Sequence, residues 1–106
     1  MRIIVAKDRE QLGSYAARQA ASVLVSGLKR QKPFFLVVAT GSSQFEVLSN
    51  LVRQPEVDWN RVHGFHLDEY LGIDSNHPAS FCGYLKERFV QHVSLGSFFH
   101  LDGTLA

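Results

Sequence analysis

The first segment whose residue types could do chemistry is Thr40-Gly41-Ser42-Ser43, a run of hydroxyl side chains around one glycine. It follows an apolar run and precedes a helical pattern, so the free amides of a helix start and three hydroxyl groups would meet in one turn. These donors suit a phosphate group, and the glycine lets the backbone approach it closely. Spacing alone leaves open a capped strand-to-helix turn without any ligand.

This segment does not carry the fingerprints of the common nucleotide sites. A Walker A loop needs Gly-Lys-Ser/Thr after four spacer residues, and the dinucleotide-binding turn needs Gly-x-Gly-x-x-Gly. Neither pattern occurs at residues 40–43. The sequence therefore favours a small phosphate ester over ATP or NAD.

The second candidate is the carboxylate pair Asp68 and Glu69, which follows the apolar run 62–67. In an extended backbone neighbouring side chains point to opposite sides, so the two carboxylates cannot both face one site. A carboxylate at a partly dehydrated strand end can serve as a general base beside a carbonyl group. We expect one of the two to take this role and the other to make a structural hydrogen bond or ion pair. Solvated surface charge is the alternative for both.

The remaining polar and aromatic residues give weaker signals. The five histidines, His66 and His77 among them, show no metal-ligand spacing, so no metal site is expected. His77 is assigned to loop or cap chemistry, with a place in the same cleft left open. Cys82 is interpreted as a small buried residue, and Trp59 and Tyr70 as packing residues.

The elements that must position these residues alternate between strand-like and helical patterns. Strands are predicted over residues 2–6, 34–39, 62–67 and 98–101, with helices that begin at Asp8 and Ser43 and a third over about 78–92. The run 34–39 is apolar throughout, which is typical of a parallel strand buried on both faces. The pattern predicts one α/β domain over 1–106: a partial doubly wound, Rossmann-like, mostly parallel sheet of three to four strands with flanking helices. In such sheets ligands bind beyond the carboxyl ends of the strands, where both polar segments fall.

Capping and periodicity refine the helices. Asp8 and Gln11 form one capping-box pattern, and Ser43 and Glu46 form another. The first helix is expected to bury one stripe, made by Leu12, Ala16, Ala20, Val23, Leu24 and Leu28. The third is expected to bury Phe81, Cys82, Leu85 and Phe89.

Composition excludes several classes of protein. A chain of 106 residues with 45% hydrophobic and 20% charged residues is one globular domain. Its formal charge is +1, and no basic run exceeds Lys29-Arg30, so a nucleic-acid partner is not expected. The longest apolar stretch, 34–39, is far shorter than the roughly 18 residues that cross a bilayer. One cysteine and no signal-peptide pattern predict a cytoplasmic protein.

Three motifs taken together resemble the glucosamine-6-phosphate deaminase/isomerase family, which is related to the 6-phosphogluconolactonases. They are Ala39–Ser43, Phe65–Ile73 and His77–Phe81, in the family's order and at its spacing. The similarity covers essentially the whole chain, from the first predicted strand to Gly103.

The resemblance implies a modified doubly wound α/β fold and a sugar-phosphate ligand. It implies that Asp68 moves a proton between C2 and C1 as glucosamine 6-phosphate becomes fructose 6-phosphate and ammonia, without a metal or organic cofactor. Glu69, Tyr70 and His77 are expected to support this site. The residues that match the family's phosphate loop are Thr40, Gly41, Ser42 and Ser43.

The chain also departs from the family. The loop Gly41-Ser42-Ser43-Gln44 lacks the proline that members commonly have, although its donors remain. Members are well over twice this length, and their later half carries an Asp-Gly-His motif used in ring opening, whereas here Thr104 follows Asp102-Gly103. We therefore expect an N-terminal portion of the family's domain, with the base and half of the phosphate site.

Three functional hypotheses remain. Tyr70 favours the deaminases over the 6-phosphogluconolactonases, which typically have Asp-Glu-Arg where this chain has Asp68-Glu69-Tyr70. A non-catalytic phosphosugar-binding module or a truncated product is the third hypothesis. A half-sheet with an unpaired edge and apolar surface also predicts self-association into a homo-oligomer.

Overall fold

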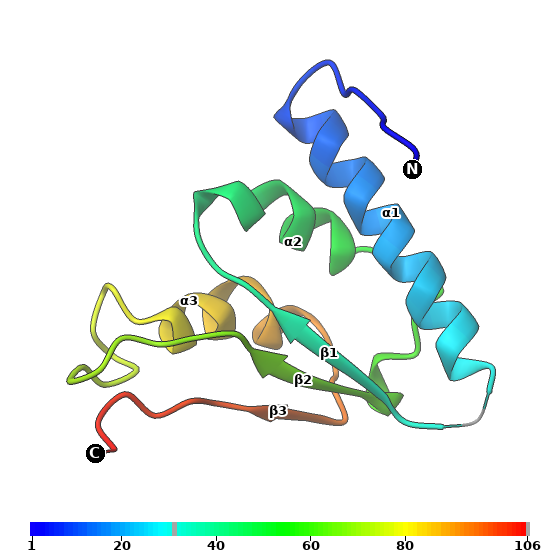
Figure 1. Cartoon of the computed structure of the whole chain (residues 1–106). Helices are drawn as coiled ribbons and strands as arrows, with labels where there is room; N and C mark the ends of the chain where they lie inside the picture. Colours follow the sequence, from blue (N-terminus) through cyan, green and yellow to red (C-terminus); the bar gives the residue numbers. More distant parts are fainter. Residues whose placement is uncertain (31, 106) are drawn as a thin grey trace.

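Parallel strands form the centre of the molecule, in the order β1-β2-β3. The computed structural model describes residues 1–30 and 32–105, which contain β1 (Phe34–Val38), β2 (Val62–His66) and β3 (Ser97–Phe99). The helices of this part of the chain are α1 (Arg9–Leu28), α2 (Phe45–Leu51) and α3 (Phe81–Arg88) (Figure 1). The α/β class with a parallel sheet and flanking helices is confirmed.

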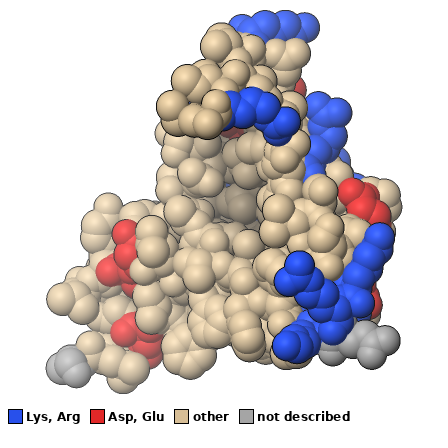
Figure 2. Space-filling model, turned by 45° about the vertical axis from the view of Figure 1, so that its right-hand side comes forward, with Lys and Arg blue, Asp and Glu red and all other residues tan. Residues whose placement is uncertain are grey.

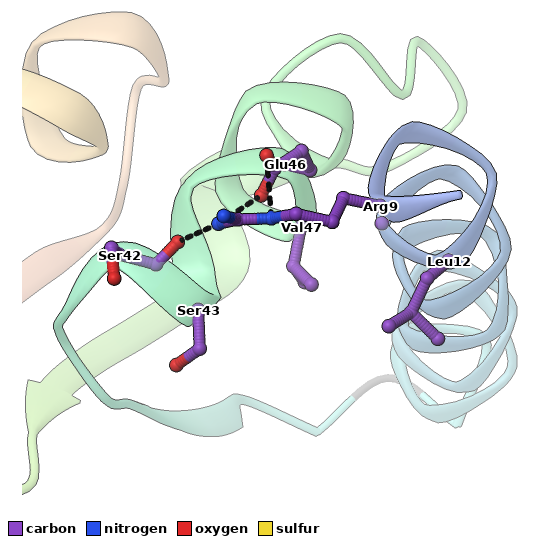
Figure 3. Close-up of a pocket in the computed structure, with 7 residues that line it drawn as sticks. Arg9, Leu12, Ser42, Ser43, Glu46 and Val47 are labelled. Atoms are coloured by element: carbon purple, nitrogen blue, oxygen red, sulfur yellow. Dashed lines mark hydrogen bonds and ion pairs between the residues drawn. The ribbon is translucent and has the colours of Figure 1, made fainter.

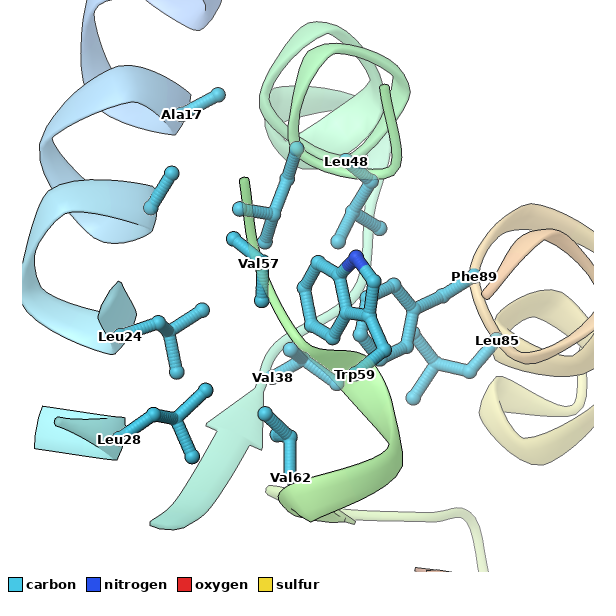
Figure 4. Packing of buried hydrophobic residues seen from close by; sticks show 12 residues of the cluster. Ala17, Leu24, Leu28, Val38, Leu48, Val57, Trp59, Val62, Leu85 and Phe89 are labelled. Carbon is cyan, nitrogen blue, oxygen red and sulfur yellow. The ribbon is translucent and has the colours of Figure 1, made fainter. Parts of the chain in front are cut away.

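The core lies between the helices and one face of the sheet. Val38 of β1 and Val62 of β2 point into it, together with Leu85 and Phe89 (Figure 4). The indole of Trp59 meets the ring of Phe89 edge to face at 5.6 Å between centroids. Burial of these side chains from all the main elements stabilises the crossovers against the sheet.

The opposite face of the sheet is open among the described residues. Phe35 and Val37 alternate with the core-facing residues of β1 and are 63% and 58% exposed. Phe99 of β3 is 62% exposed on the same side, and the ring of Phe65 bridges Phe35 and Phe99 with centroid distances of 6.2 and 6.1 Å. The prediction that 34–39 is buried on both faces is wrong, because α1, α2 and α3 all pack on one face.

Helix α1 begins as predicted but is rotated about its axis relative to the expected stripe. The Asp8 carboxylate accepts a 2.7 Å hydrogen bond from the Gln11 amide, and the Gln11 side chain accepts from the amide of Lys7. Leu12 and Val23 lie on the exposed side instead of in the core. The face that packs on α2 consists of smaller residues, Gly13, Ala17 and Ala21, followed by Leu24 and Leu28.

Close approach of the two helices explains this rotation. A Cβ atom on Gly13 would lie 2.6 Å from the backbone carbonyl carbon of Glu46 in α2. Only a residue without a side chain fits there, so packing selects the small residues and leaves the larger Leu12 outside.

The N-terminal strand predicted over 2–6 is wrong. These residues form no strand, and Ile3 and Val5 are 75% and 89% exposed. A β-branched run becomes a strand only beside a partner, and no described strand lies next to it.

The other predicted elements are confirmed with shifted ends. The strands predicted over 34–39, 62–67 and 98–101 are present as β1, β2 and β3. The third helix is shorter than 78–92, since α3 ends at Arg88 and a 3-10 turn, Val90–His92, follows. Its Cys82, Leu85 and Phe89 are buried, whereas Phe81 is half-buried.

The surface carries few charges on the face seen in Figure 2. Lys and Arg gather along the right-hand side and at the top, with acidic groups beside them, and a broad uncharged area separates these from further acidic groups at the left (Figure 2). Among the described residues, no helix is both long enough and apolar enough to traverse a bilayer.

Candidate functional site

The loop 40–43 and Asp68 leave neighbouring parallel strands at the same edge of the sheet. Val38 pairs with His66, and the amide of Leu67 donates to the carbonyl of Val38 at 3.1 Å. Thr40 and Asp68 each stand two residues beyond that last pair, on strands about 4.8 Å apart. The two predicted segments therefore emerge side by side at the carboxyl edge, where open α/β sheets bind ligands.

Gly41 gives the loop its conformation. Its φ of 111° lies in the left-handed region, and a Cβ there would meet nothing within 4 Å. The constraint at this position is thus the backbone angle rather than space, and any other residue would be strained.

The start of the following helix differs from the prediction. A 3-10 turn, Ser42–Gln44, comes first, and α2 begins at Phe45 with no side-chain cap. The capping box of Ser43 and Glu46 is wrong, because Glu46 pairs with Arg9 of α1 instead. The donors that this loop offers are therefore its own amides and hydroxyl groups rather than the end of a long helix.

Arg9 was missed by the sequence reasoning and holds the loop from α1. Its Nη2 donates to the carbonyl of Ser42 at 2.7 Å, and its Nε lies 3.3 Å from Oε1 of Glu46 (Figure 3). These residues line a pocket of about 230 Å³ together with Leu12, Gly13, Ser43 and Val47. Asp68 is not among its lining residues, so this pocket lies on the α1 side of the loop.

Tyr84 is the second residue that sequence reasoning missed. Its hydroxyl donates to the carbonyl of Gly41 at 3.0 Å from α3. Its ring stacks on Phe45 at 5.8 Å, and the guanidinium of Arg88 lies 4.0 Å from the Phe45 centroid. Residues 43 positions apart make this contact, so no local pattern could have revealed it.

Asp68 is exposed at the end of β2. Among the described residues, no hydrogen-bond donor or cation engages its carboxylate.

Glu69 is held inside the protein by the start of α3. It accepts hydrogen bonds from the hydroxyl of Ser80 at 2.7 Å and from the amides of Phe81, Cys82 and Tyr70 at 2.9, 3.0 and 2.9 Å. Burial alone would raise its pKa, but these hydrogen bonds together lower the pKa of Glu69 to about 2. Of the two neighbouring carboxylates, Glu69 makes the structural contacts and Asp68 is free.

Tyr70 and His77 lie in the loop between β2 and α3. The Tyr70 ring packs on Phe81 at 4.8 Å and is about half exposed. Nδ1 of His77 accepts from the amide of Ala79 at 3.0 Å, and its carbonyl accepts from the amide of Ser80 at 2.9 Å. In the structure Tyr70 and His77 contact the residues at and just before the start of α3.

A thiol–imidazole pair lies behind the start of α3. Sγ of Cys82 is 3.1 Å from Nδ1 of His100. Burial raises the pKa of the Cys82 thiol and lowers the pKa of His100, which favours the neutral form of both groups. The described residues contain no group of three or more His, Cys, Asp or Glu side chains arranged to hold a metal ion.

Comparison with known proteins decides the family. The family model for glucosamine-6-phosphate isomerases/6-phosphogluconolactonase matches residues 7–104. The chain belongs to this family. The resemblance read from the three sequence motifs is thereby confirmed.

Relatives within the family include glucosamine-6-phosphate deaminases. That of Borrelia garinii subsp. bavariensis is 31% identical over 99 residues, which cover 90% of this chain and 37% of that protein. That of Arthrobacter sp. (strain FB24) is 34% identical over 112 residues, which cover 100% of this chain and 41% of that protein. The chain thus spans about two fifths of the length of these relatives.

Solved structures of the family share the fold. A monomeric glucosamine-6-phosphate deaminase superposes with a TM-score of 0.82 and 26% identity, over 99% of this chain and 44% of that one. A 6-phosphogluconolactonase from Shewanella baltica OS155 gives a TM-score of 0.84 at 20% identity, over 94% of this chain and 42% of that one. At 20% identity, the likeness to the lactonase shows a shared fold and no more.

Proposed function

We propose that this chain binds a phosphorylated sugar at the carboxyl edge of its sheet and carries the base of an aldose–ketose isomerisation. The reaction is the conversion of glucosamine 6-phosphate to fructose 6-phosphate with release of ammonia. The observation that carries the proposal is the position of Asp68, two residues beyond β2 and without a partner among the described residues, beside a loop two residues beyond β1. Family membership and the deaminases among the relatives support it.

The loop would hold the phosphate through neutral donors. The amides of Ser42 and Ser43 make no hydrogen bond to a described protein group. The hydroxyls of Thr40, Ser42 and Ser43 add further donors. Hydrogen bonds to a charged group contribute about 1.5–3 kcal/mol each, so a few of them give weak but specific binding.

Asp68 would act on the sugar as a carboxylate. It would take the proton from C2 and return it to C1, while the amino group leaves C2 as ammonia after water adds. Glu69 cannot replace it, because its two oxygens already accept four hydrogen bonds. The role of Glu69 would be to hold Asp68 in place.

We propose that the 106 residues bind weakly and turn over negligibly by themselves. Catalysis needs several groups held together, and losing one wall of a site costs orders of magnitude in rate. The relatives contain more than half of their length beyond the matched part. We place the reaction in the cytoplasm, where a reduced thiol such as that of Cys82 persists.

The binding step is tested by titrating the 15N-labelled chain with glucosamine 6-phosphate, unphosphorylated glucosamine and inorganic phosphate. We expect saturable shifts of the Ser42 and Ser43 amides with the two phosphate compounds only. The double variant Ser42→Ala/Ser43→Ala should bind more weakly, and Ser22→Ala/Ser26→Ala on the exposed side of α1 serves as the control. Shifts with glucosamine alone, or none at residues 40–43, would refute the phosphate site.

A 6-phosphogluconolactonase activity is the second candidate, because the family model that matches this chain also covers the 6-phosphogluconolactonases. Tyr70 at the position after Asp68-Glu69 argues for the deaminase branch. Because negligible turnover is expected of this chain, parallel titrations with glucosamine 6-phosphate and 6-phosphogluconate, rather than rate assays, separate the two. Equal affinity for both sugars would instead support a non-catalytic phosphosugar-binding module.

We also propose that two copies of the chain associate through the open face of the sheet. Phe35, Val37, Phe65 and Phe99 form a continuous apolar patch there. Patches of this kind on a monomer favour association, and β1 and β3 each have one edge that pairs with no described strand.

A further inference from the structure

The carbonyl of Gly41 is held by two donors from different parts of the chain. It accepts from the amide of Gln44 at 3.0 Å, which closes the 3-10 turn, and from the hydroxyl of Tyr84 at 3.0 Å. A carbonyl oxygen has two lone pairs, so both are used. The Gly41 carbonyl is therefore directed toward the protein, on the side of α3.

The next carbonyl, that of Ser42, is held in the same manner. It accepts from the amide of Phe45 and from Nη2 of Arg9 at 2.7 Å. Glu46 fixes the guanidinium of Arg9 with contacts of 3.3 Å to both of its oxygens. This carbonyl is directed toward α1 (Figure 3).

Because a peptide bond is planar, the contacts that fix the two carbonyls also fix the direction of the N–H groups bonded to them. The described peptide bonds are trans, so the N–H of each residue points opposite to the carbonyl of the residue before it. Tyr84, by holding the Gly41 carbonyl, orients the N–H of Ser42. Arg9, by holding the Ser42 carbonyl, orients the N–H of Ser43.

We propose that Tyr84 and Arg9 are positioning residues of the phosphate loop, which keep the Ser42 and Ser43 amides turned outward for the ligand. This inference rests on the proposed function. Neither side chain contacts the phosphate: each acts on one peptide plane, from a separate helix. The loop is thereby preorganised, and the ligand does not have to order it.

The two residues differ in how firmly they are held. Tyr84 stacks on Phe45 and is half-buried. Burial, more than the opposing effect of Arg88, raises the pKa of Tyr84, so its hydroxyl remains a donor at neutral pH. The side chain of Arg9 is 64% exposed and depends on Glu46, so its hold on the loop is more sensitive to salt.

Tyr84→Phe removes the hydroxyl and leaves the ring stacking in place. We expect the affinity for glucosamine 6-phosphate to fall about fivefold, the effect of one ordinary hydrogen bond. Tyr15→Phe on α1 is the matched control, since among the described residues its hydroxyl hydrogen-bonds to Arg2 and not to the loop 40–43. Arg9→Met should weaken binding by a similar factor, with Arg18→Met on the exposed side of α1 as its control.

A spectroscopic pattern distinguishes positioning from general damage to the fold. In the ligand-free chain, Tyr84→Phe should shift the Ser42 amide resonance most, and Arg9→Met the Ser43 amide. Resonances of β2 should stay unchanged, which shows that the variants are folded. Equal binding by wild type and both variants would overturn the proposal. The same pattern of loop amide shifts in Tyr84→Phe and Arg9→Met would overturn it as well.

The same experiments separate this inference from the proposed function. If the wild-type chain binds no sugar phosphate, the proposed function fails, and with it the role of both residues at a phosphate site. If the wild type binds and Tyr84→Phe binds equally well, the proposed function stands and only the positioning role fails.

Discussion

The amide of Leu67 donates to the carbonyl of Val38 at 3.1 Å, one residue before Asp68 and two before Thr40. This hydrogen bond keeps β1 and β2 paired up to the points where each turns into a polar segment. The distance between loop and carboxylate is therefore set by the regular spacing of a parallel sheet rather than by a flexible connection.

Replacement of Asp68 by asparagine separates binding of the sugar phosphate from its conversion. The wild-type chain should release ammonia from glucosamine 6-phosphate barely above the uncatalysed rate, because the relatives have more than half of their length outside the matched part. Asp68→Asn should bind the sugar phosphate with at most a few-fold change, since the side chains that hydrogen-bond to the phosphate loop among the described residues are Arg9 and Tyr84. Robust ammonia release by the chain that Asp68→Asn abolishes would contradict the expectation of negligible turnover and would establish the base directly.

Gly41 and Gly72 offer a matched pair of backbone substitutions. Both have positive φ, 111° and 86°, and open space where a Cβ would stand. Alanine at either position should cost about 1 kcal/mol of stability through backbone strain. Only Gly41→Ala should also weaken phosphate binding, because only that glycine lies in the phosphate loop. Equal binding by both variants in a calorimetric titration would show that the loop 40–43 does not bind the phosphate.

The lowered pKa of Glu69 predicts that the free energy of unfolding depends on pH. Its pKa of about 2 in the folded chain lies below the ordinary value of 4.5, so its carboxylate is favoured by folding. The stabilisation is complete above pH 4.5 and is lost as the pH falls toward 2. After allowance for solvent screening we expect a contribution of about 1–2 kcal/mol.

Urea unfolding between pH 2.5 and 6 measures this contribution. Glu69→Gln should lower stability at pH 6 and flatten the pH profile over this range. The exposed Glu56→Gln is the control and should follow the wild type. A wild-type profile that is flat between pH 4.5 and 2.5 would contradict the assignment.

The open face of the sheet predicts concentration-dependent association. Phe35→Lys, at a side chain 63% exposed in the apolar patch, should shift the chain toward monomer in sedimentation experiments. Val23→Lys, 60% exposed on α1, adds the same charge away from the patch and should leave association unchanged. A wild-type chain that sediments as a monomer at high concentration would argue against association through this face.

Local patterns in the sequence predicted the features that depend on local interactions. The cap at Asp8, the strand predicted over 62–67 and the burial of Cys82 and Leu85 on α3 follow from neighbouring residues, and they are present. The motifs also placed both polar segments at strand ends, because a parallel sheet brings such ends to one edge.

Contacts between distant residues account for what the sequence did not predict. The capping box of Ser43 and Glu46 is displaced by an ion pair with Arg9, 37 residues earlier. The buried stripe of α1 is set by the close contact of Gly13 with α2. Tyr84 touches the loop across 43 positions. Such contacts leave no periodicity in the chain.

The order of the strands in the sheet equals their order along the chain. Each described strand therefore pairs with the next strand along the chain through one crossover, and no pairing among the described strands skips a strand. Low sequence separation of this kind favours rapid folding. We expect β1 and β2 with α2 to assemble first on the ribosome, and α3 with β3 to add as they emerge.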